Sequence, residues 1–135
     1  MDFSDTIGVS AAGMRAQEER LRVAAENLAN KDTTGSTRGA DPYRRKTITF
    51  QATLDQASGV SSVKVKGIGQ DNTPFQTKYD PSHPAADAKG YVKMPNVNSM
   101  VEIMDTHEAQ HSYEANLNTM QISRSMATRT INLIK

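Results

Sequence analysis

The chain has 135 residues, no cysteine, and 16 basic residues against 15 acidic ones, which leaves a net charge of only +1. Without cysteine it can form no disulfide, no thiolate metal site and no cysteine nucleophile. Leu, Ile, Val and Phe contribute 23 of the 135 residues, about 17 percent, below the roughly 20 percent under which a chain struggles to fold alone. Because a disordered chain would normally carry a high net charge, this composition indicates a protein that completes its core with neighbouring subunits.

Residues 3–28 carry the pattern of a long helix. Ile7, Met14, Leu21 and Leu28 recur at every seventh position, which is the spacing of a coiled-coil seam. The first thirty residues have neither a basic start nor an apolar run of seven residues, so we expect no ordinary signal peptide. Nothing in the sequence approaches the roughly 18 apolar residues of a membrane span, so we expect no direct membrane insertion.

The middle of the chain has a different character. Residues 31–97 hold all five prolines and most of the glycines. The alternating runs RKTITFQ, at residues 45–51, and SVKVKGI, at residues 62–68, are typical of short strands, and residues 90–94 favour one more. We therefore interpret residues 35–97 as a β-rich insert of loops around two to four short strands.

Residues 98–135 return to a helical pattern. Ser99 and Glu102 fit a capping box, in which the two side chains satisfy each other's free backbone amides. No glycine or proline follows, so the helix can continue for about 37 residues, or roughly 55 Å. Its apolar side chains form two adjoining rows at seven-residue spacing. The first row is Tyr113, Met120, Ala127 and Ile134, and the second is Ile103, Leu117 and Ile131.

These patterns predict a mainly α protein in three parts. Residues 1–34 form an N-terminal helix, residues 35–97 the β-rich insert, and residues 98–135 a C-terminal helix. We expect the two long helices to pack as a coiled-coil-like pair, and their thin apolar stripes to be covered by helices of other subunits. The residues that we expect at these assembly interfaces are Ile7, Met14, Leu21, Leu28, Leu117, Met120, Ile131 and Ile134.

The stretch HEAQH, at residues 107–111, matches the pattern that zinc proteases place on a helix, with Glu108 as general base. Such a site also needs a third ligand and an open coordination position for water. The downstream candidate is Glu114, only three residues away on the same helix, and His83 lies upstream, in the wrong order. We therefore expect no metal, no cofactor and no enzyme activity; a zinc-dependent hydrolase using this segment is the alternative.

The cluster Arg44-Arg45-Lys46 raises a second alternative, a nucleic-acid-binding module. Non-specific affinity for nucleic acid comes from net neutralisation of phosphates, and the charge of this chain is close to zero. We therefore expect no nucleic-acid partner. A solvated strand face, or charged contacts to a partner subunit, accounts better for these three residues.

Three stretches go beyond periodicity. They are ENLAN at residues 26–30 with TTG at residues 33–35, SHPAADAKGYVKMPNVN at residues 82–98, and SYEANL at residues 112–117. Together they resemble the bacterial flagellar basal-body rod proteins, and the middle stretch is similar to the C-type proximal rod proteins in particular. Members of that family usually carry proline where this chain has Ser99.

The resemblance implies a structural subunit of the proximal rod, which polymerises through its terminal helices into the axial drive shaft that transmits torque. It implies export unfolded through the flagellar type III apparatus and a place in the rod within the periplasm. The implied partners are copies of the chain itself, other rod proteins, and basal-body adaptor and export-gate proteins. The motif residues are Asn27, Asn30, Tyr113 and Asn116, of which the three asparagines are candidates for polar contacts that fix helix ends and register.

Overall fold

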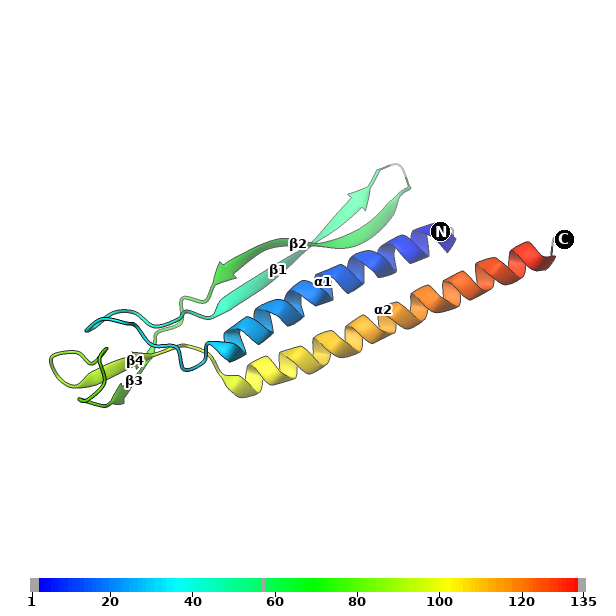
Figure 1. Ribbon diagram of the computed structural model, residues 1–135. Coiled ribbons are helices and arrows are strands. Elements are labelled where there is room, and N and C mark those ends of the chain that lie inside the picture. Colours follow the sequence, from blue (N-terminus) through cyan, green and yellow to red (C-terminus); the bar gives the residue numbers. More distant parts are fainter. Residues whose placement is uncertain (1–2, 57, 134–135) are drawn as a thin grey trace. The chain divides into compact units, whose positions relative to one another are not determined.

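A computed structural model describes residues 3–56 and 58–133 (Figure 1). Among these residues there are two helices and four strands, in the order α1 (Phe3–Ala29), β1 (Lys46–Asp55), β2 (Val60–Gln70), β3 (Gln76–Tyr79), β4 (Tyr91–Met94) and α2 (Ser99–Leu133). A long helix near each end with a small β region between them is the expected order, and it is confirmed. Within the described part of the chain, neither helix is long and apolar enough to cross a membrane.

The strands form two small sheets. β1 pairs with β2, and β3 pairs antiparallel with β4, starting from Gln76 opposite Met94. A turn joins β1 to β2, where Gly59 has a φ of 67° and its N–H donates to the carbonyl of Asp55 at 2.8 Å. Glycine adopts this left-handed conformation without a steric cost. β1, β2 and β4 fall on the runs that the sequence predicts as strands.

The chain divides into two compact units. The first, unit 1, contains Met1–Leu21, Ile48–Gly67 and His107–Lys135, and the second, unit 2, contains Arg22–Thr47 and Ile68–Thr106. Unit 1 therefore combines the start of α1, most of the β1–β2 hairpin and the end of α2. Unit 2 combines the end of α1, the β3–β4 hairpin and the start of α2. Each unit is built from segments that are far apart in the sequence.

The buried apolar side chains are small. They are Ala16, Val23, Ala24, Ala85, Ala86, Val92 and Ala109. In unit 2, Ala85, Ala86 and Val92 form a cluster against which Met94 packs. Alanine removes much less apolar surface from water than leucine or isoleucine, so the hydrophobic stabilisation within one chain is limited. The largest fully buried side chains among the described residues are Glu102, Val92 and Asn27, of which two are polar.

The start of α2 differs from the predicted capping box. Asn98 caps the helix, because its Oδ1 accepts hydrogen bonds from the N–H groups of Met100, at 3.0 Å, and Val101, at 3.4 Å. Asparagine is as effective at this position as serine. The Glu102 carboxylate is buried against other segments and forms part of the polar network described below. The prediction that Ser99 and Glu102 cap each other was therefore wrong.

Candidate assembly interface

The two helices approach closely in unit 1. Gly13 is buried, and a Cβ atom built on it would lie 2.9 Å from the Oδ1 atom of Asn116. Seven residues further along α1, Arg20 forms an ion pair of 3.0 Å with Glu108. The contact position on α2 falls as the position on α1 rises, so the two helices are antiparallel within this unit.

Unit 2 contains a third contact between α1 and α2. Asn27, seven residues after Arg20, donates from Nδ2 to the Glu102 carboxylate at 3.2 Å. On α2 the most buried positions recur at similar spacing, with Glu102 at 1% exposure and Ala109 at 0%. Ser123, in unit 1, is also buried. Within one chain, the facing positions of the helices are therefore small or polar residues.

Most of the residues that the sequence predicts at the assembly interface are half-buried in the single chain. Of the interface residues expected from the sequence, Ile131 is 60% exposed and Ile134 lies outside the described residues. The others are half-buried, as is Tyr113 of the family motif. The half-buried residues are Ile7, Met14, Leu21, Leu28, Leu117 and Met120.

An apolar face of α2 is exposed in unit 1. Ile122, Met126 and Leu133 are 60%, 51% and 87% exposed. At 3.6 residues per turn these three side chains fall within roughly 40° of one another, and roughly 110° around the helix from the buried row of Ala109 and Ser123. We call this set the outer stripe. Scattered exposed apolar residues are ordinary, but a row along one helix face indicates contact with a partner.

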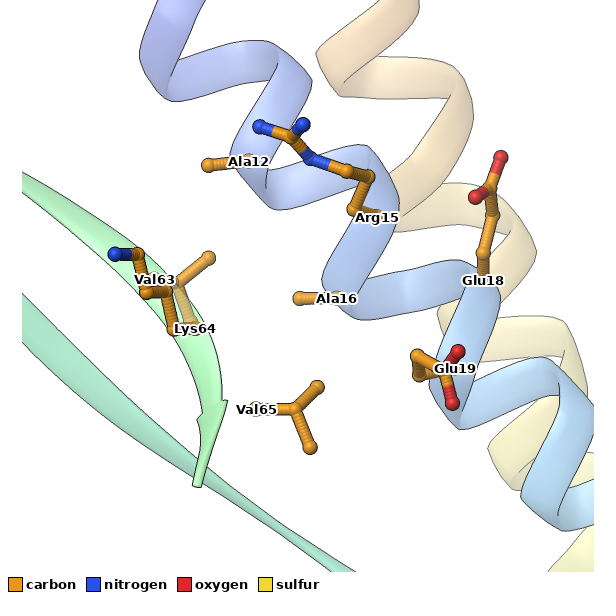
Figure 2. Close-up of a pocket in the computed structure, with 8 residues that line it drawn as sticks. All are labelled: Ala12, Arg15, Ala16, Glu18, Glu19, Val63, Lys64 and Val65. Carbon is orange, nitrogen blue, oxygen red and sulfur yellow. The ribbon is translucent and has the colours of Figure 1, made fainter. Parts of the chain in front are cut away.

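Unit 1 also has a groove between α1 and β2, with a volume of about 540 Å³ (Figure 2). Small apolar side chains from the two elements form its walls, and charged side chains of both signs surround them. The apolar residues are Ala12, Ala16, Val63 and Val65, and the charged ones are Arg15, Glu18, Glu19 and Lys64. The groove thus presents a small apolar surface bordered by charges of both signs.

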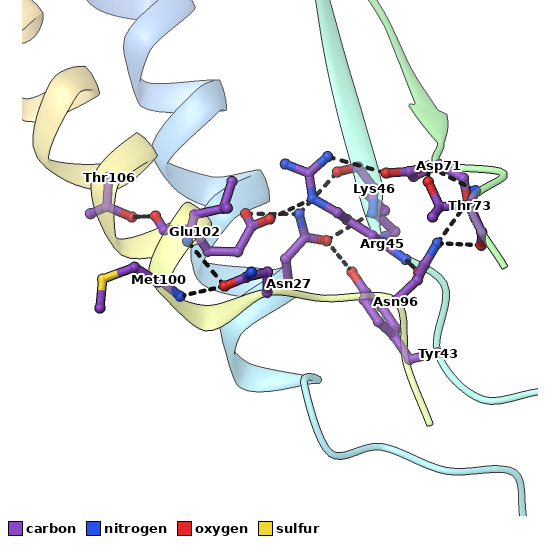
Figure 3. Close-up of polar contacts among 12 residues, drawn as sticks. Asn27, Tyr43, Arg45, Lys46, Asp71, Thr73, Asn96, Met100, Glu102 and Thr106 are labelled. Atoms are coloured by element: carbon purple, nitrogen blue, oxygen red, sulfur yellow. Dashed lines mark hydrogen bonds and ion pairs between the residues drawn. The ribbon is translucent and has the colours of Figure 1, made fainter. Parts of the chain in front are cut away.

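The buried centre of unit 2 is a polar network around Asn27 (Figure 3). Its Nδ2 donates to the Lys46 carbonyl at 2.9 Å and to Glu102 at 3.2 Å. Its Oδ1 accepts from the Tyr43 hydroxyl and from the Lys46 N–H, both at 2.8 Å. An asparagine amide has two donor hydrogens and two acceptor lone pairs, so every hydrogen-bonding position of Asn27 is used. A tyrosine hydroxyl is protonated at neutral pH, and burial raises the pKa of Tyr43 further, so the hydroxyl acts as a donor.

Arg45 extends the network to the insert. Its Nε donates to the Glu102 carboxylate at 2.5 Å, and its Nη1 lies 3.5 Å from the Asp71 carboxylate. Burial acts to lower the pKa of Arg45, but the bond to Glu102 and the nearby carboxylates raise it overall, so the guanidinium is charged. Hydrogen bonds from Thr73, followed by the charge of Arg45, lower the pKa of Asp71. The network thus joins the charged side chains of Glu102, Arg45 and Asp71 to the amide of Asn27.

The motif residue Asn30 lies at the end of α1. Its Nδ2 donates to the Glu26 carbonyl at 2.9 Å, and its Oδ1 accepts from the Thr33 hydroxyl at 3.1 Å. These bonds satisfy backbone and side-chain groups where the helix stops. Asn116 instead bonds within α2, from Nδ2 to the Ser112 carbonyl at 2.9 Å, while its side chain lies against Gly13.

The HEAQH segment lies on α2 with His107 and His111 both exposed. Glu108, the candidate general base, is paired with Arg20. Over residues 3–56 and 58–133, no group of three or more His, Cys, Asp or Glu side chains is placed to hold a metal ion. His83 lies in unit 2, where its Nδ1 accepts from the Ala85 N–H at 3.1 Å.

The basic cluster is engaged within the chain. Arg44 stacks on the Phe75 ring, with 4.3 Å from Cζ to the ring centroid. Arg45 binds carboxylates of the network, and Lys46 pairs with Glu26. The expectation of a solvated strand face is therefore wrong for these three residues, because carboxylates and an aromatic ring of the same chain bind them; contacts to a partner subunit stay a prediction.

Two features of this interface were missed by sequence reasoning. Glu102 and Arg45 are far apart in the sequence, and no local pattern predicts their pairing. The outer stripe was overlooked because it does not coincide with the rows chosen for their seven-residue repeat. The small residues Gly13 of α1 and Ala109 and Ser123 of α2 were a sequence signal for the faces on which the two helices meet, since small side chains allow helices to approach closely.

Comparison with known proteins agrees with this architecture. Residues 88–133 match the family model described as the C-terminal part of the flagellar basal body rod FlgEFG proteins. The chain is 50% identical over 127 residues to the flagellar basal-body rod protein FlgC of Agrobacterium fabrum, covering 94% of this chain and 91% of that protein. It is 39% identical to FlgC of Escherichia coli, with 98% of both chains covered, and 34% identical to FlgC of Bacillus subtilis, covering 96% of this chain and 97% of that protein.

The fold, with a long helix near each end, and these matches define the class: a structural subunit of the bacterial flagellar basal-body rod. Within that class, the chain belongs to the FlgC family of rod proteins. The relatives give no support to the alternative of a zinc-dependent hydrolase.

Proposed function

We propose that the chain polymerises through α1 and α2 into the proximal part of the axial drive shaft, and that this shaft transmits torque. Its partners in the proposal are copies of itself and the other rod proteins, with basal-body adaptor and export-gate proteins at the base. Membership of the FlgC family supports assembly with rod components. The shaft would lie in the periplasm, and the chain would reach it unfolded through the flagellar type III apparatus.

One observation carries this proposal, the outer stripe of α2. Ile122, Met126 and Leu133 are more than half exposed, on a helix whose inner face already meets α1. A helix with two apolar or close-packed faces is typical of an inner position in a bundle. Burying each of these side chains against a neighbour would contribute about 1.5–3 kcal/mol. The half-buried rows that include Leu21, Leu28 and Leu117 would then lie at the edges of the same contacts.

The pairing of α1 and α2 is coiled-coil-like in this proposal. The positions of α1 that contact α2, Gly13, Arg20 and Asn27, are seven residues apart, which is the repeat of such a seam. Small and polar side chains at these positions let the two helices approach closely but contribute little to the stability of their pairing. Stability would then come from contacts between subunits.

The small core of one chain also suits unfolded export. Ordering a backbone costs about 1–2 kcal/mol per residue, and a core of alanine and valine offsets little of it. The free chain should therefore be weakly helical and gain helix on assembly, which also prevents polymerisation before export. Circular dichroism of the purified free chain checks this, since a cooperative and strongly helical monomer would contradict it.

An enzymatic role is not part of the proposal. The relatives are named as rod proteins, and Glu108, which a zinc hydrolase would need as its base, is bound to Arg20 in a 3.0 Å ion pair. Relatives that are structural proteins support a structural role for this chain.

The direct test is to place a charge on the outer stripe. Met126→Asp should abolish incorporation into basal bodies, because each subunit would bury an unpaired carboxylate against its neighbour. Gln121→Asp is the matched control, since Gln121 is also an exposed residue of α2 but lies roughly 140° away around the helix. The measurements are swimming in soft agar and the amount of the chain in purified basal bodies. Full incorporation of Met126→Asp would contradict the proposal.

A further inference from the structure

We infer that Asn27, Arg45 and Glu102 form a lock, which fixes the register of α1 against α2 and makes their pairing depend on folding of the insert. All contacts of this lock lie within unit 2. The inference goes beyond assembly of the rod, and it holds whichever rod proteins contact the chain.

The side chain of Glu102 is 1% exposed, on the face of α2 that meets α1. A carboxylate in such a place is strongly disfavoured unless it is paired and hydrogen-bonded. The partners here are Arg45 Nε at 2.5 Å and Asn27 Nδ2 at 3.2 Å. Only one of these two partners, Arg45, carries a compensating charge.

Arg45 belongs to the insert, just before β1, and it is held there by several bonds. Its N–H donates to Asn96 Oδ1 at 2.8 Å, and its guanidinium approaches Asp71 at 3.5 Å. Asn96 in turn donates to the carbonyls of Asp71 and Thr73, at 3.0 and 3.1 Å (Figure 3). The cation that neutralises Glu102 is therefore in place only when distant parts of the insert have come together.

The four hydrogen bonds of Asn27 reach Tyr43, both backbone groups of Lys46, and Glu102. Sliding α2 along α1 by one heptad, or two turns, would move Glu102 about 10.5 Å, which breaks the bond to Asn27 and separates the carboxylate from Arg45. Buried polar pairs of this kind set register in coiled coils better than apolar side chains do, because apolar contacts can be exchanged for similar ones.

The lock imposes an order on folding of the insert and docking of the helices. α2 docks on α1 in the correct register only after residues 43–46 and the segments that hold them have folded. With an unfolded insert, docking would bury the Glu102 carboxylate without its cation. A chain in transit therefore has a built-in obstacle to premature helix pairing, which disappears when the insert folds.

The test uses the absence of cysteine in the chain, which makes introduced cysteines unambiguous. Cysteines replace Arg20 and Glu108, which form an ion pair, to report the native register. In a second set, cysteines replace Arg20 and Ala115, a position one heptad further along α2. The full-length chains replace the chromosomal copy, and purified basal bodies are treated with a short bis-maleimide. Without changes in the lock, cross-linking should favour the pair at 20 and 108 by at least tenfold.

The lock is then altered in both sets. Asn27→Leu with Glu102→Leu keeps the site filled but removes the polar contact between α1 and α2, and the ratio of the two cross-links should fall to within about threefold of unity. Arg45→Met leaves Glu102 buried without a cation, and the native cross-link should drop at least fivefold. Adding Glu102→Leu to Arg45→Met should restore helix pairing. Lys46→Met is the matched control, because it removes a half-exposed pair with Glu26 and leaves the backbone bonds of Lys46 to Asn27 intact.

The outcomes separate the possibilities. Where a variant does not reach basal bodies, the free chain is cross-linked in trimethylamine N-oxide, which favours folded states. An unchanged ratio in the double leucine variant, or equal effects of Arg45→Met and Lys46→Met, would overturn the lock. Absence of the unaltered chain from basal bodies would instead count against the proposed function.

Discussion

A methyl group added at Gly13 probes the contact between α1 and α2 most sharply. In Gly13→Ala, the new Cβ would lie 2.9 Å from Oδ1 and 3.0 Å from both Cγ and Nδ2 of Asn116, against an optimum of about 3.5–4.0 Å between carbon atoms. Asn116 would have to turn away and lose its bond to the Ser112 carbonyl. Overpacking of this kind costs about 1–3 kcal/mol, whereas alanine gains about 1 kcal/mol over glycine in a helix. The net loss should be about 0–2 kcal/mol.

Gly8→Ala is the matched control. Gly8 lies on the same helix and is exposed, and no atom lies within 4 Å of a Cβ built there. This variant should therefore show only the helix-propensity gain of about 1 kcal/mol. The difference between the two variants isolates the cost of the contact with Asn116. Adding Asn116→Ala to Gly13→Ala should recover most of that difference.

The assay is the guanidinium concentration at which half of the chain is released from purified basal bodies. We expect the midpoint to rise or stay level for Gly8→Ala, to fall for Gly13→Ala, and to return toward the parent value when Asn116→Ala is added. A rise for Gly13→Ala equal to that for Gly8→Ala would refute the reasoning, because it would mean that α2 does not cross α1 at this glycine.

Leu117→Asp should block incorporation into the rod while the protein is still exported, which the location of the variant in cell fractions measures; a motile strain would show that this side chain faces solvent. Replacing His107 and His111 together by Gln should leave motility nearly intact, and stoichiometric zinc in the assembled protein would argue against this expectation. Because hydrogen bonds from Thr73 lower the pKa of Asp71, its stabilisation should be present above the unfolded-state pKa of about 3.9 and lost as pH falls through the lower folded-state value. Asp71→Asn should remove that part of the acid sensitivity of basal bodies, and an unchanged acid titration would count against it.

The sequence was informative about the elements because their signals are local. The seven-residue repeat through Ile7, Met14, Leu21 and Leu28 predicts a helix whose observed bounds, Phe3–Ala29, are nearly the same. Alternation of polar and apolar residues located β1 and β2, and residues 90–94 were expected to form one more strand, which is β4. β3 was not singled out, because its four residues are all exposed and carry no alternation of burial.

The contacts between elements were harder to predict, for a physical reason. Apolar periodicity reports which side chains avoid water in the assembled state, but the face that α2 presents to α1 within one chain consists of Glu102, Ala109 and Ser123. Charged side chains in a helix are usually solvated, so the sequence favoured a local capping role for Glu102. Its pairing with Arg45 depends on the tertiary fold. The low content of large aliphatic residues did predict the small core of a single chain.

The most direct measurement is a side-chain-resolution electron cryomicroscopy map of basal bodies purified from the bacterium that encodes this chain. The account predicts that the chain lies in the proximal rod with α1 and α2 along the shaft, and that helices of neighbouring subunits cover Ile122, Met126 and Leu133. A map in which these three side chains face solvent, or in which the rod contacts are made by the β1–β2 and β3–β4 hairpins alone, would contradict it.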